Sequence, residues 1–181
     1  GRSFADIHPQ IIRYTERVGA KLAYNPGTHE LEAGAEANKE LLEHCLVLIL
    51  NSEEAGELAR GDFVKFAEEK RAEQIGKLMK ELRELGPDIV VVTDGANGSY
   101  AFDGDSLVFV PPIKTDVVEM TGAGDSFSAG FLSALISGED LEEALLWGNI
   151  NASSVISEIG CQKGLLTKEE MTKHLENYQD D

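Results

Sequence analysis

Apolar and polar positions along the chain alternate between helical and strand periods, so the sequence predicts an α/β fold. Two short apolar runs, "CLVLIL" at 45–50 and "IVVVT" at 89–93, are typical of strands that are buried on both faces. A shorter strand is expected at 21–25, and a hairpin is expected over "SYAF", "DGDS" and "LVFV" at 99–110. A further short strand at 117–119 completes the predicted sheet.

Segments with helical spacing lie between and after these strands. They cover residues 7–18, 33–44, 52–60, 63–85, 126–137 and 140–158, and a capped C-terminal helix opens at Thr167 with Glu170 three residues on. Apolar strands separated by helices favour a layered, mainly parallel sheet with helices on both faces, joined by right-handed crossovers. The sequence shows no internal repeat and no linker, so we expect one α/β domain over residues 1–181.

Small, polar or acidic residues follow three of the predicted strands. "NSEE" follows the strand at 45–50, "DGANG" follows the strand at 89–93, and "TGAGD" follows the strand at 117–119. Ligands of parallel sheets bind beyond the carboxyl ends of the strands. The sequence therefore predicts that the three stretches lie at one edge of the sheet and form a binding site.

In the third stretch, Gly122, Ala123 and Gly124 precede Asp125 at the start of a predicted helix. The N–H groups of such a turn can converge on one anionic oxygen, and the positive end of the helix adds to their field. Asp125 could then accept the proton of a hydroxyl group during phosphoryl transfer. The alternative is a tight turn followed by an aspartate that caps its helix, and five letters alone favour this alternative because short patterns often match by chance.

The other two stretches also allow two interpretations each. Asn51 and Glu54 would share one side of a helical first turn and could hold a hydrated Mg²⁺ through water, or Asn51 could simply cap a helix with an acidic first turn. Gly95 and Gly98 would let the backbone approach a nucleotide, or could form a plain turn. No helix follows them as in a dinucleotide fingerprint, and the sequence has no GxxxxGK[ST] phosphate loop.

Composition and charge narrow the classes of partner. Of the 181 residues, 42% are hydrophobic and 27% are charged, which is typical of a soluble globular protein. No apolar run approaches 18 residues and no secretory leader is recognisable, so we expect a cytoplasmic protein. The net charge of −17 argues against nucleic acid and anionic membranes as partners. Backbone N–H groups or a metal ion would therefore have to supply the positive field for a phosphate.

The cysteine, histidine and tryptophan residues give weaker signals. Cys45 and Cys161 are expected to be buried free thiols, because two cysteines far apart make neither a metal site nor a clear disulfide. The histidines lack metal-ligand spacing and are expected at the surface or at helix caps; they are His8, His29, His44 and His174. Trp147 is expected in the core.

Four stretches together resemble the ribokinase-like (PfkB) family of carbohydrate and nucleoside kinases. "VVEMTGAGDSFSAGFLSAL" resembles the family's Asp-Thr-Thr-Gly-Ala-Gly-Asp signature, and "NSEE" resembles its Asn-x-x-Glu motif. "TDGANG" is similar to its Thr-x-Gly-x-x-Gly nucleotide loop, and "WGNINASSVISEIGC" to the helix and turn that cover the adenine. The four occur in the family's order, and the resemblance runs over nearly the whole sequence. It implies a ribokinase-like fold and ATP-dependent phosphoryl transfer to a hydroxyl group of a sugar or nucleoside.

The resemblance also implies a role for each matching residue. Asp125 would be the base for the acceptor hydroxyl, and the amides of Gly122, Ala123 and Gly124 would form the anion hole for the transferred phosphoryl group. Asn51 and Glu54 would organise Mg²⁺ and the phosphates. The residues expected to hold the nucleotide are Thr93, Asp94, Gly95, Gly98, Thr121 and Asn149.

The sequence departs from the family pattern in two ways. In relatives, an aspartate at the position of Glu119, the threonine matching Thr121 and carbonyls near Gly160 hold a monovalent cation, and the longer Glu119 argues against that site here. We also expect that residues 1–181 do not include the family's N-terminal substrate and lid region. We therefore expect the nucleotide-binding portion of a kinase, with little or no activity by itself, small-molecule sugar or nucleoside partners, and a homodimer of the full-length parent. The alternative is a non-catalytic nucleotide-binding or interaction module that keeps the fold.

Overall fold

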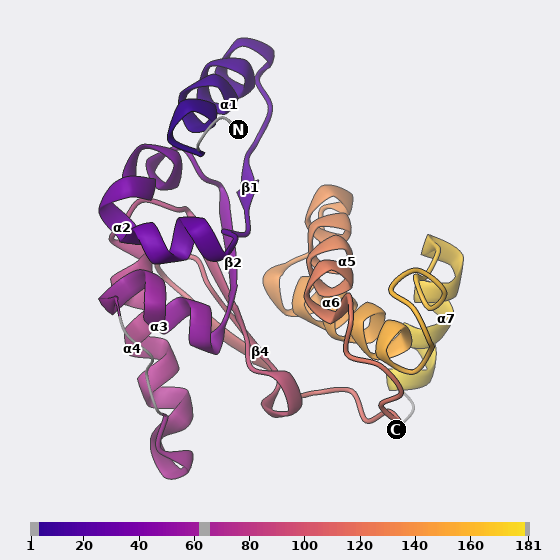
Figure 1. Cartoon of the computed structure of the whole chain (residues 1–181). Coiled ribbons are helices and arrows are strands. Elements are labelled where there is room, and N and C mark those ends of the chain that lie inside the picture. The colour runs from indigo at the N-terminus through magenta and orange to yellow at the C-terminus, as the bar shows by residue number, and fades with distance from the viewer. Residues whose placement is uncertain (1–3, 62–65, 180–181) are drawn as a thin grey trace. The chain divides into compact units, whose positions relative to one another are not determined.

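The computed structural model describes residues 4–61 and 66–179 (Figure 1). Contacts group the chain into two compact units, which we call unit 1 (residues 1–94 and 100–107) and unit 2 (residues 95–99 and 108–181). The prediction of one α/β domain over residues 1–181 spans both units and stays a prediction. In the two described ranges, no helix combines the length and the apolar character that crossing a membrane requires.

A five-stranded sheet has the strand order β1-β2-β3-β4-β5. Its strands are β1 (Ala23–Tyr24), β2 (Val47–Asn51), β3 (Ile89–Thr93), β4 (Ser99–Phe102) and β5 (Leu107–Val110). β1 is parallel to β2, and β2 is parallel to β3 with Val47 opposite Ile89 and Asn51 opposite Thr93. Five residues connect β3 to β4, and four residues connect β4 to β5. Connections this short join antiparallel neighbours, because a parallel pair needs a longer crossover. The sheet is therefore mixed, and its parallel part is β1 to β3.

In unit 1, helices α2, α3 and α4 share one hydrophobic core with the sheet, and Figure 1 shows them beside it. The helical elements of this unit are α1 (Phe4–Val18), α2 (Thr28–Glu43), α3 (Ser52–Arg60), the 3₁₀ turn η1 (Glu68–Lys70) and α4 (Arg71–Arg83). Leu48 and Val90 point into this core, whereas their neighbours Ile49 and Val91 point to the opposite face and are also buried. Both faces of β2 and β3 are covered, as their uninterrupted apolar runs predict.

Helix α2 begins five residues before its predicted start because it continues through a kink. Gly34 has φ 77° and ψ 178°, which interrupts the helical backbone. The buried Asn38 side chain donates hydrogen bonds to the carbonyls of Glu30 (2.7 Å) and Gly34 (2.8 Å), and the Tyr24 hydroxyl donates to Asn38 Oδ1 (2.9 Å). These side-chain contacts satisfy backbone groups that the kink leaves without helical partners.

Unit 2 contains the 3₁₀ turn η2 (Gly95–Asn97) and three helices, α5 (Ala123–Ser137), α6 (Leu141–Ile156) and α7 (Lys168–Gln179). Helices α5 and α6 approach closely because glycines lie at their contact. A Cβ atom on Gly130 would lie 2.7 Å from the Trp147 carbonyl oxygen, and one on Gly148 would lie 2.7 Å from the Phe127 ring. Trp147 is 6% exposed, which confirms its predicted place in the core.

The predicted strand at 117–119 is wrong. Residues 117–119, which the structure describes, have no strand conformation. The N–H groups of Val118 and Glu119 instead donate to the carbonyl oxygen of Ile156, at 2.8 and 3.1 Å, at the end of α6. Val117 and Val118 are exposed. The segment is thus bonded to a helix terminus and not to a neighbouring strand, which its apolar letters could not reveal.

Three smaller predictions also need correction or limits. Cys45 is buried, but Cys161 is exposed because it lies in the turn after α6. His8 is only 6% exposed and packs edge-on against the Tyr24 ring, and this burial lowers the pKa of its imidazole. The predicted helix at 63–85 is observed as η1 and α4, and its first residues, 63–65, lie outside the described residues. With these changes, the predicted α/β class is confirmed.

Candidate functional site

The carboxyl ends of β2 and β3 bring two predicted site residues together in unit 1. Asn51 and Thr93 are register partners at the ends of neighbouring parallel strands. Asn51 is exposed and Thr93 is half-buried. Because the ends of parallel strands meet at the same edge of a sheet, the "NSEE" and "TDGANG" stretches both start at one edge, as the sequence predicts.

Asn51 and Glu54 form a capping box at the start of α3. Asn51 Oδ1 accepts hydrogen bonds from the N–H groups of Glu53 and Glu54, at 2.9 Å each, and Glu54 Oε2 accepts one from the Asn51 N–H at 2.8 Å. The helix-cap interpretation of these residues therefore describes what their side chains do in this structure. The reciprocal bonds satisfy donors that the first turn of any helix leaves unpaired.

The capping box limits how these residues could contact Mg²⁺. The amide oxygen of Asn51 already accepts two hydrogen bonds, and one oxygen of Glu54 accepts a third. The remaining oxygen, Glu54 Oε1, suits a water of a hydrated Mg²⁺, which keeps several waters and needs few protein ligands. Within residues 4–61 and 66–179, no group of three or more His, Cys, Asp and Glu side chains is placed to hold a metal directly.

Asp94 is occupied by a partner that the sequence did not suggest. Its side chain is 2% exposed, and the Arg71 guanidinium binds it through two hydrogen bonds, from Nε to Oδ2 and from Nη2 to Oδ1, the latter at 2.6 Å. These hydrogen bonds are the main reason that the pKa of the Arg71 guanidinium is raised above its ordinary value. Arg71 also lies over the Phe66 ring, 5.4 Å from its centroid. The pair ties the end of β3 to the start of α4.

In unit 2, the turn before α5 requires glycine at one position. Gly122 has φ 84°, in the left-handed region, and precedes the first helical residue. A Cβ atom at Gly122 would lie 2.5 Å from the Cβ of Cys161, which is closer than such atoms pack. Both the backbone conformation and the contact therefore exclude a side chain at this position.

The amide groups of this turn are mostly available for a ligand. The N–H groups of Gly122 and Gly124 have no acceptor among the residues that the structure describes, and the same holds for the N–H of Asp125. The N–H of Ala123, which was expected to join them, donates to the Met120 carbonyl at 3.3 Å. The three available donors lie at the positive end of a 15-residue helix, where an anion is stabilised.

Asp125 does not cap α5. Its side chain is exposed, and no hydrogen bond or ion pair joins it to any described residue. Ser126 fulfils the local bonding of the first turn instead, because its hydroxyl donates to the carbonyls of Gly122 (2.7 Å) and Ala123 (3.0 Å). The competing interpretation of Asp125 as a cap is therefore wrong, and its carboxylate is available to a ligand.

The remaining predicted nucleotide-binding residues of unit 2 are engaged within the chain. The Asn149 side chain accepts from the Ser99 hydroxyl (3.0 Å) and donates to the Pro111 carbonyl (3.1 Å). Gly98 packs its backbone against β5, since a Cβ atom there would lie 2.4 Å from the Val110 carbonyl oxygen. The Thr121 hydroxyl is hydrogen-bonded to the Glu119 carboxylate. Asn149 thus fixes the chain segments around the loop that begins at Gly95.

Asn151 lies in α6 and positions the start of α5, a role that the sequence did not reveal. It is buried, its Nδ2 donates to the Ser126 carbonyl at 2.7 Å, and its Oδ1 accepts from the Leu166 N–H at 3.1 Å. These bonds join the first turn of α5 to α6 and to the turn before α7. A polar residue on an otherwise apolar helix face is the signal that could have identified it, because buried amides need partners.

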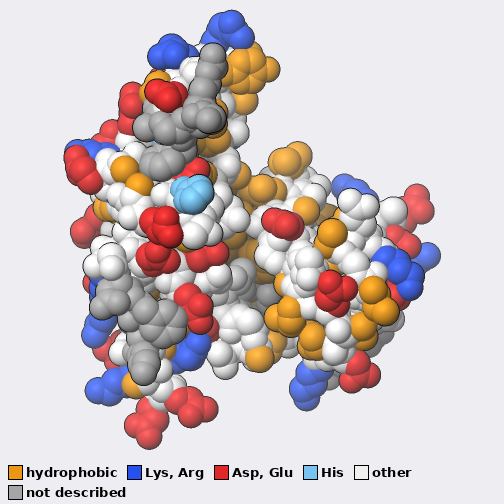
Figure 2. All heavy atoms as spheres, viewed as in Figure 1, with side chains coloured by type: hydrophobic (Ala, Val, Ile, Leu, Met, Phe, Trp, Pro, Cys, Tyr) orange, Lys and Arg blue, Asp and Glu red, His pale blue; other side chains and the backbone are white. Residues whose placement is uncertain are grey.

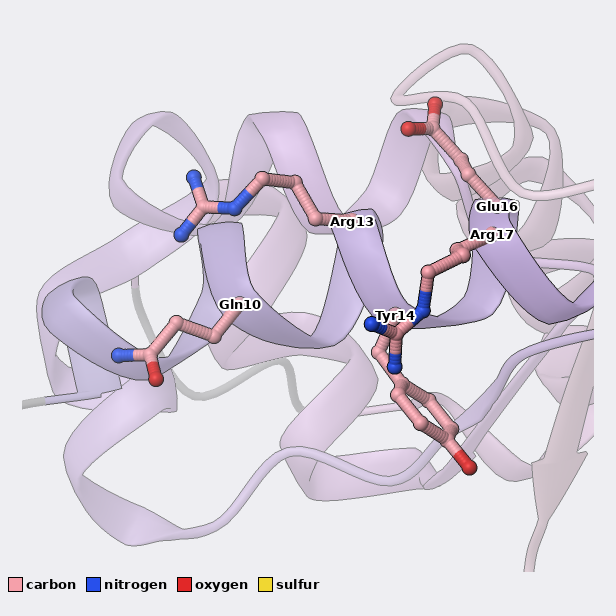
Figure 3. Close-up of a pocket in the computed structure, with 5 residues that line it drawn as sticks. All are labelled: Gln10, Arg13, Tyr14, Glu16 and Arg17. Carbon is pink, nitrogen blue, oxygen red and sulfur yellow. The ribbon is translucent and has the colours of Figure 1, made fainter.

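A surface hollow on α1 is lined by none of the predicted site residues. Figure 3 shows this open depression of about 800 Å³, which side chains of a single helix, α1, line. There the Arg17 guanidinium lies 5.3 Å from the centroid of the Tyr14 ring. Figure 2 shows Asp and Glu side chains dispersed over the visible face and not gathered in one patch. Neither the hollow nor the distribution of surface charge therefore indicates where the predicted phosphoryl-transfer site lies.

Comparison with known proteins identifies the family. The family model described as "pfkB family carbohydrate kinase" matches residues 28–168. An uncharacterized sugar kinase of Archaeoglobus fulgidus is 33% identical over 144 residues, which are 80% of this chain and 53% of the relative. A nucleoside kinase of Methanocaldococcus jannaschii is 32% identical over 158 residues, which are 87% of this chain and 48% of the relative.

Solved structures give the same answer for the fold. The crystal structure of a Methanocaldococcus jannaschii nucleoside kinase matches 87% of this chain with a TM-score of 0.70. The structure of Arabidopsis thaliana ribokinase with ribose and ATP, 26% identical, matches 94% of this chain and 52% of that chain with a TM-score of 0.80. The expected ribokinase-like fold is thus confirmed, and the chain spans about half the length of the curated relatives it matches. The chain belongs to the pfkB family of carbohydrate kinases.

Proposed function

We propose that this chain is the nucleotide-binding portion of a kinase that transfers a phosphoryl group from ATP to a hydroxyl group of a sugar or nucleoside. The observation that carries the proposal is the start of α5. There the N–H groups of Gly122 and Gly124 adjoin the exposed carboxylate of Asp125, and none of these groups has a partner among the residues that the structure describes. The named relatives are sugar and nucleoside kinases, and the Arabidopsis thaliana ribokinase was solved with ribose and ATP, which supports the substrate classes.

In this proposal, the glycine amides and Asp125 have separate tasks. The N–H groups of Gly122 and Gly124 stabilise negative charge on the oxygens of the transferred group, without any lysine, in a chain whose net charge is −17. Asp125 accepts the proton of the acceptor hydroxyl as its oxygen bonds to the γ-phosphorus and the bond to ADP breaks. In a loose transition state this proton leaves late, so a positioned carboxylate suffices as the base.

Mg²⁺ would be held through water by Glu54 and would neutralise charge on the phosphates. Asn51 contributes indirectly, since its side chain fixes the first turn of α3 that carries Glu54. Thr93, the register partner of Asn51, stands where the nucleotide loop begins. Asn149 shapes the same loop through its bonds to Ser99 and Pro111.

The role of the glycine amides can be tested on the 181-residue chain with two variants at Gly124. A Cβ atom there meets no other atom within 4 Å, so Gly124→Ala keeps the N–H and adds only a methyl group. Gly124→Pro removes the N–H at a first-turn position that tolerates proline. We expect Gly124→Pro to bind ATP·Mg²⁺ at least about tenfold more weakly than Gly124→Ala, measured by isothermal titration calorimetry, because one hydrogen bond to a charged group is lost. Equal affinities would show that this N–H does not hold the nucleotide.

The catalytic role of Asp125 requires a full-length kinase that contains this chain. There, Asp125→Asn is expected to lower turnover by about 10²–10⁴-fold, the usual contribution of a general base, with little change in ATP affinity. Asp116→Asn, another exposed aspartate of unit 2, is the matched control and should leave turnover unchanged. Unchanged turnover in Asp125→Asn would refute the assignment. ATP binding with no transfer to any sugar or nucleoside would favour the non-catalytic module.

A further inference from the structure

Glu119 lies three residues before the glycine turn and contacts the turn that follows α6. Its Oε2 accepts a hydrogen bond from the Gly160 N–H at 2.9 Å, and its carboxylate is also hydrogen-bonded to the Thr121 hydroxyl. These two bonds lower the pKa of the Glu119 carboxyl below its ordinary value. The Glu119 side chain is half-buried, and its contact joins two segments of unit 2.

Three further contacts join the same segments. The N–H groups of Val118 and Glu119 both donate to the Ile156 carbonyl, at 2.8 and 3.1 Å. Further along the same segment, the Gly122 backbone lies so close to Cys161 that a Cβ atom on Gly122 would clash with it. The segment 118–122 therefore follows the turn 156–161 along its length, and the Glu119 carboxylate is the side chain that crosses between them.

The arrangement does not suit a monovalent cation at Glu119. The carboxylate faces two hydrogen-bond donors of the chain, the Gly160 N–H and the Thr121 hydroxyl. A cation at this place would need oxygen lone pairs directed at it, whereas Gly160 presents its N–H to the carboxylate. Glutamate reaches this N–H directly because it has one methylene group more than aspartate. The observed contact therefore engages the carboxylate that, by the resemblance, would face a monovalent cation.

We propose that Glu119 is a positioning residue that fixes the Gly122–Gly124 turn to the turn after α6, so that phosphate binding at this turn does not depend on K⁺ or Na⁺. The inference rests on the proposed function only for the identity of the phosphate ligand. The hydrogen bond between Glu119 and Gly160 links two loops that are 41 residues apart. A side chain of the protein thus forms the bridge that a bound cation would otherwise form.

The first test reads the contact and the turn without any nucleotide. In the 181-residue chain, amide hydrogen exchange measured by NMR should be about tenfold faster at Gly160 in Glu119→Ala than in wild type, because a charge-assisted hydrogen bond is lost. The amide signals of Gly122 and Gly124 should shift in the same variant, and Glu119→Gln, which keeps an acceptor oxygen, should restore part of both effects. The matched control is Glu158→Gln, which breaks the neighbouring ion pair with Lys163 and should leave these signals in place.

The second test uses the wild-type chain, so it does not depend on a variant that folds. We expect the amide signals of Gly122, Gly124 and Gly160, and the affinity for ATP·Mg²⁺, to stay the same when K⁺ or Na⁺ replaces tetramethylammonium at constant ionic strength. Shifted amide signals or tighter nucleotide binding in K⁺ would overturn the proposal. Unchanged Gly122 and Gly124 signals in Glu119→Ala would also overturn it. Shifted signals in a chain that binds no ATP would uphold the positioning role and refute the proposed function instead.

Discussion

The glycine turn before α5 gives the sharpest test of the structure, through Gly122→Ala. Two costs can be separated at this position. Gly122 has φ 84°, and a left-handed backbone costs an alanine roughly 1–2 kcal/mol. The new Cβ would also lie 2.5 Å from the Cβ of Cys161, so one of the two segments has to move, and overpacking of this kind costs roughly 1–3 kcal/mol. We therefore expect Gly122→Ala to lower the free energy of unfolding by about 2–5 kcal/mol.

A double-mutant cycle with Cys161→Gly separates these two contributions. Removal of the Cys161 Cβ removes the clash but leaves the backbone cost, so Gly122→Ala should cost only about 1–2 kcal/mol in that background. The coupling energy of the cycle then measures the contact itself. Gly124→Ala is the matched control, because its Cβ meets no atom within 4 Å and the position is helical. It should be neutral or stabilise α5 by about 0.5–1 kcal/mol.

The assay is urea unfolding followed by tryptophan fluorescence. Trp147 is the only tryptophan of the chain and is buried in unit 2, so its emission reports the unit that contains both Gly122 and Cys161. A Gly122→Ala variant as stable as wild type would refute the left-handed turn and its contact. Equal costs with and without Cys161→Gly would refute the contact between Gly122 and Cys161 alone.

Three further predictions concern the described residues of unit 1 and the two thiols. Arg71→Met should cost about 3 kcal/mol of stability in circular-dichroism unfolding because it removes the guanidinium that pairs with the buried Asp94 carboxylate, and Asp94→Leu added to it should recover much of the loss; no recovery would argue against a buried pair. Asn51→Ala should cost about 1 kcal/mol through loss of the capping box, whereas Asn51→Asp should cost little; equal effects would contradict the cap. Burial raises the pKa of the Cys45 thiol to about 12, so at pH 8 iodoacetamide should modify only Cys161 in the native chain and both cysteines in urea, as counted by mass spectrometry; two labels on the native chain would disprove the burial of Cys45.

The sequence by itself determined the local elements and the order of the motifs. The apolar runs at 45–50 and 89–93 predict β2 and β3 because strands buried on both faces need apolar side chains at every position. The turn "DGDS" is equally local, since Asp103 Oδ1 accepts hydrogen bonds from the N–H groups of Asp105 and Ser106. All of these features depend on the spacing of residues that are close in the sequence. The resemblance of the glycine turn to a kinase signature depends on such local spacing too.

Only the tertiary structure decided how the candidate site is held in place. Asp94 meets Arg71 across 23 residues, and Glu119 meets Gly160 across 41, and neither pair has a spacing that a helical or strand period could reveal. The apolar letters at 117–119 predict a strand because they record only local preference, whereas the bonds of Val118 and Glu119 to Ile156 depend on where α6 ends. Contacts of this kind arise when packed elements bring distant segments together, so they are properties of the folded chain and not of any window of its sequence.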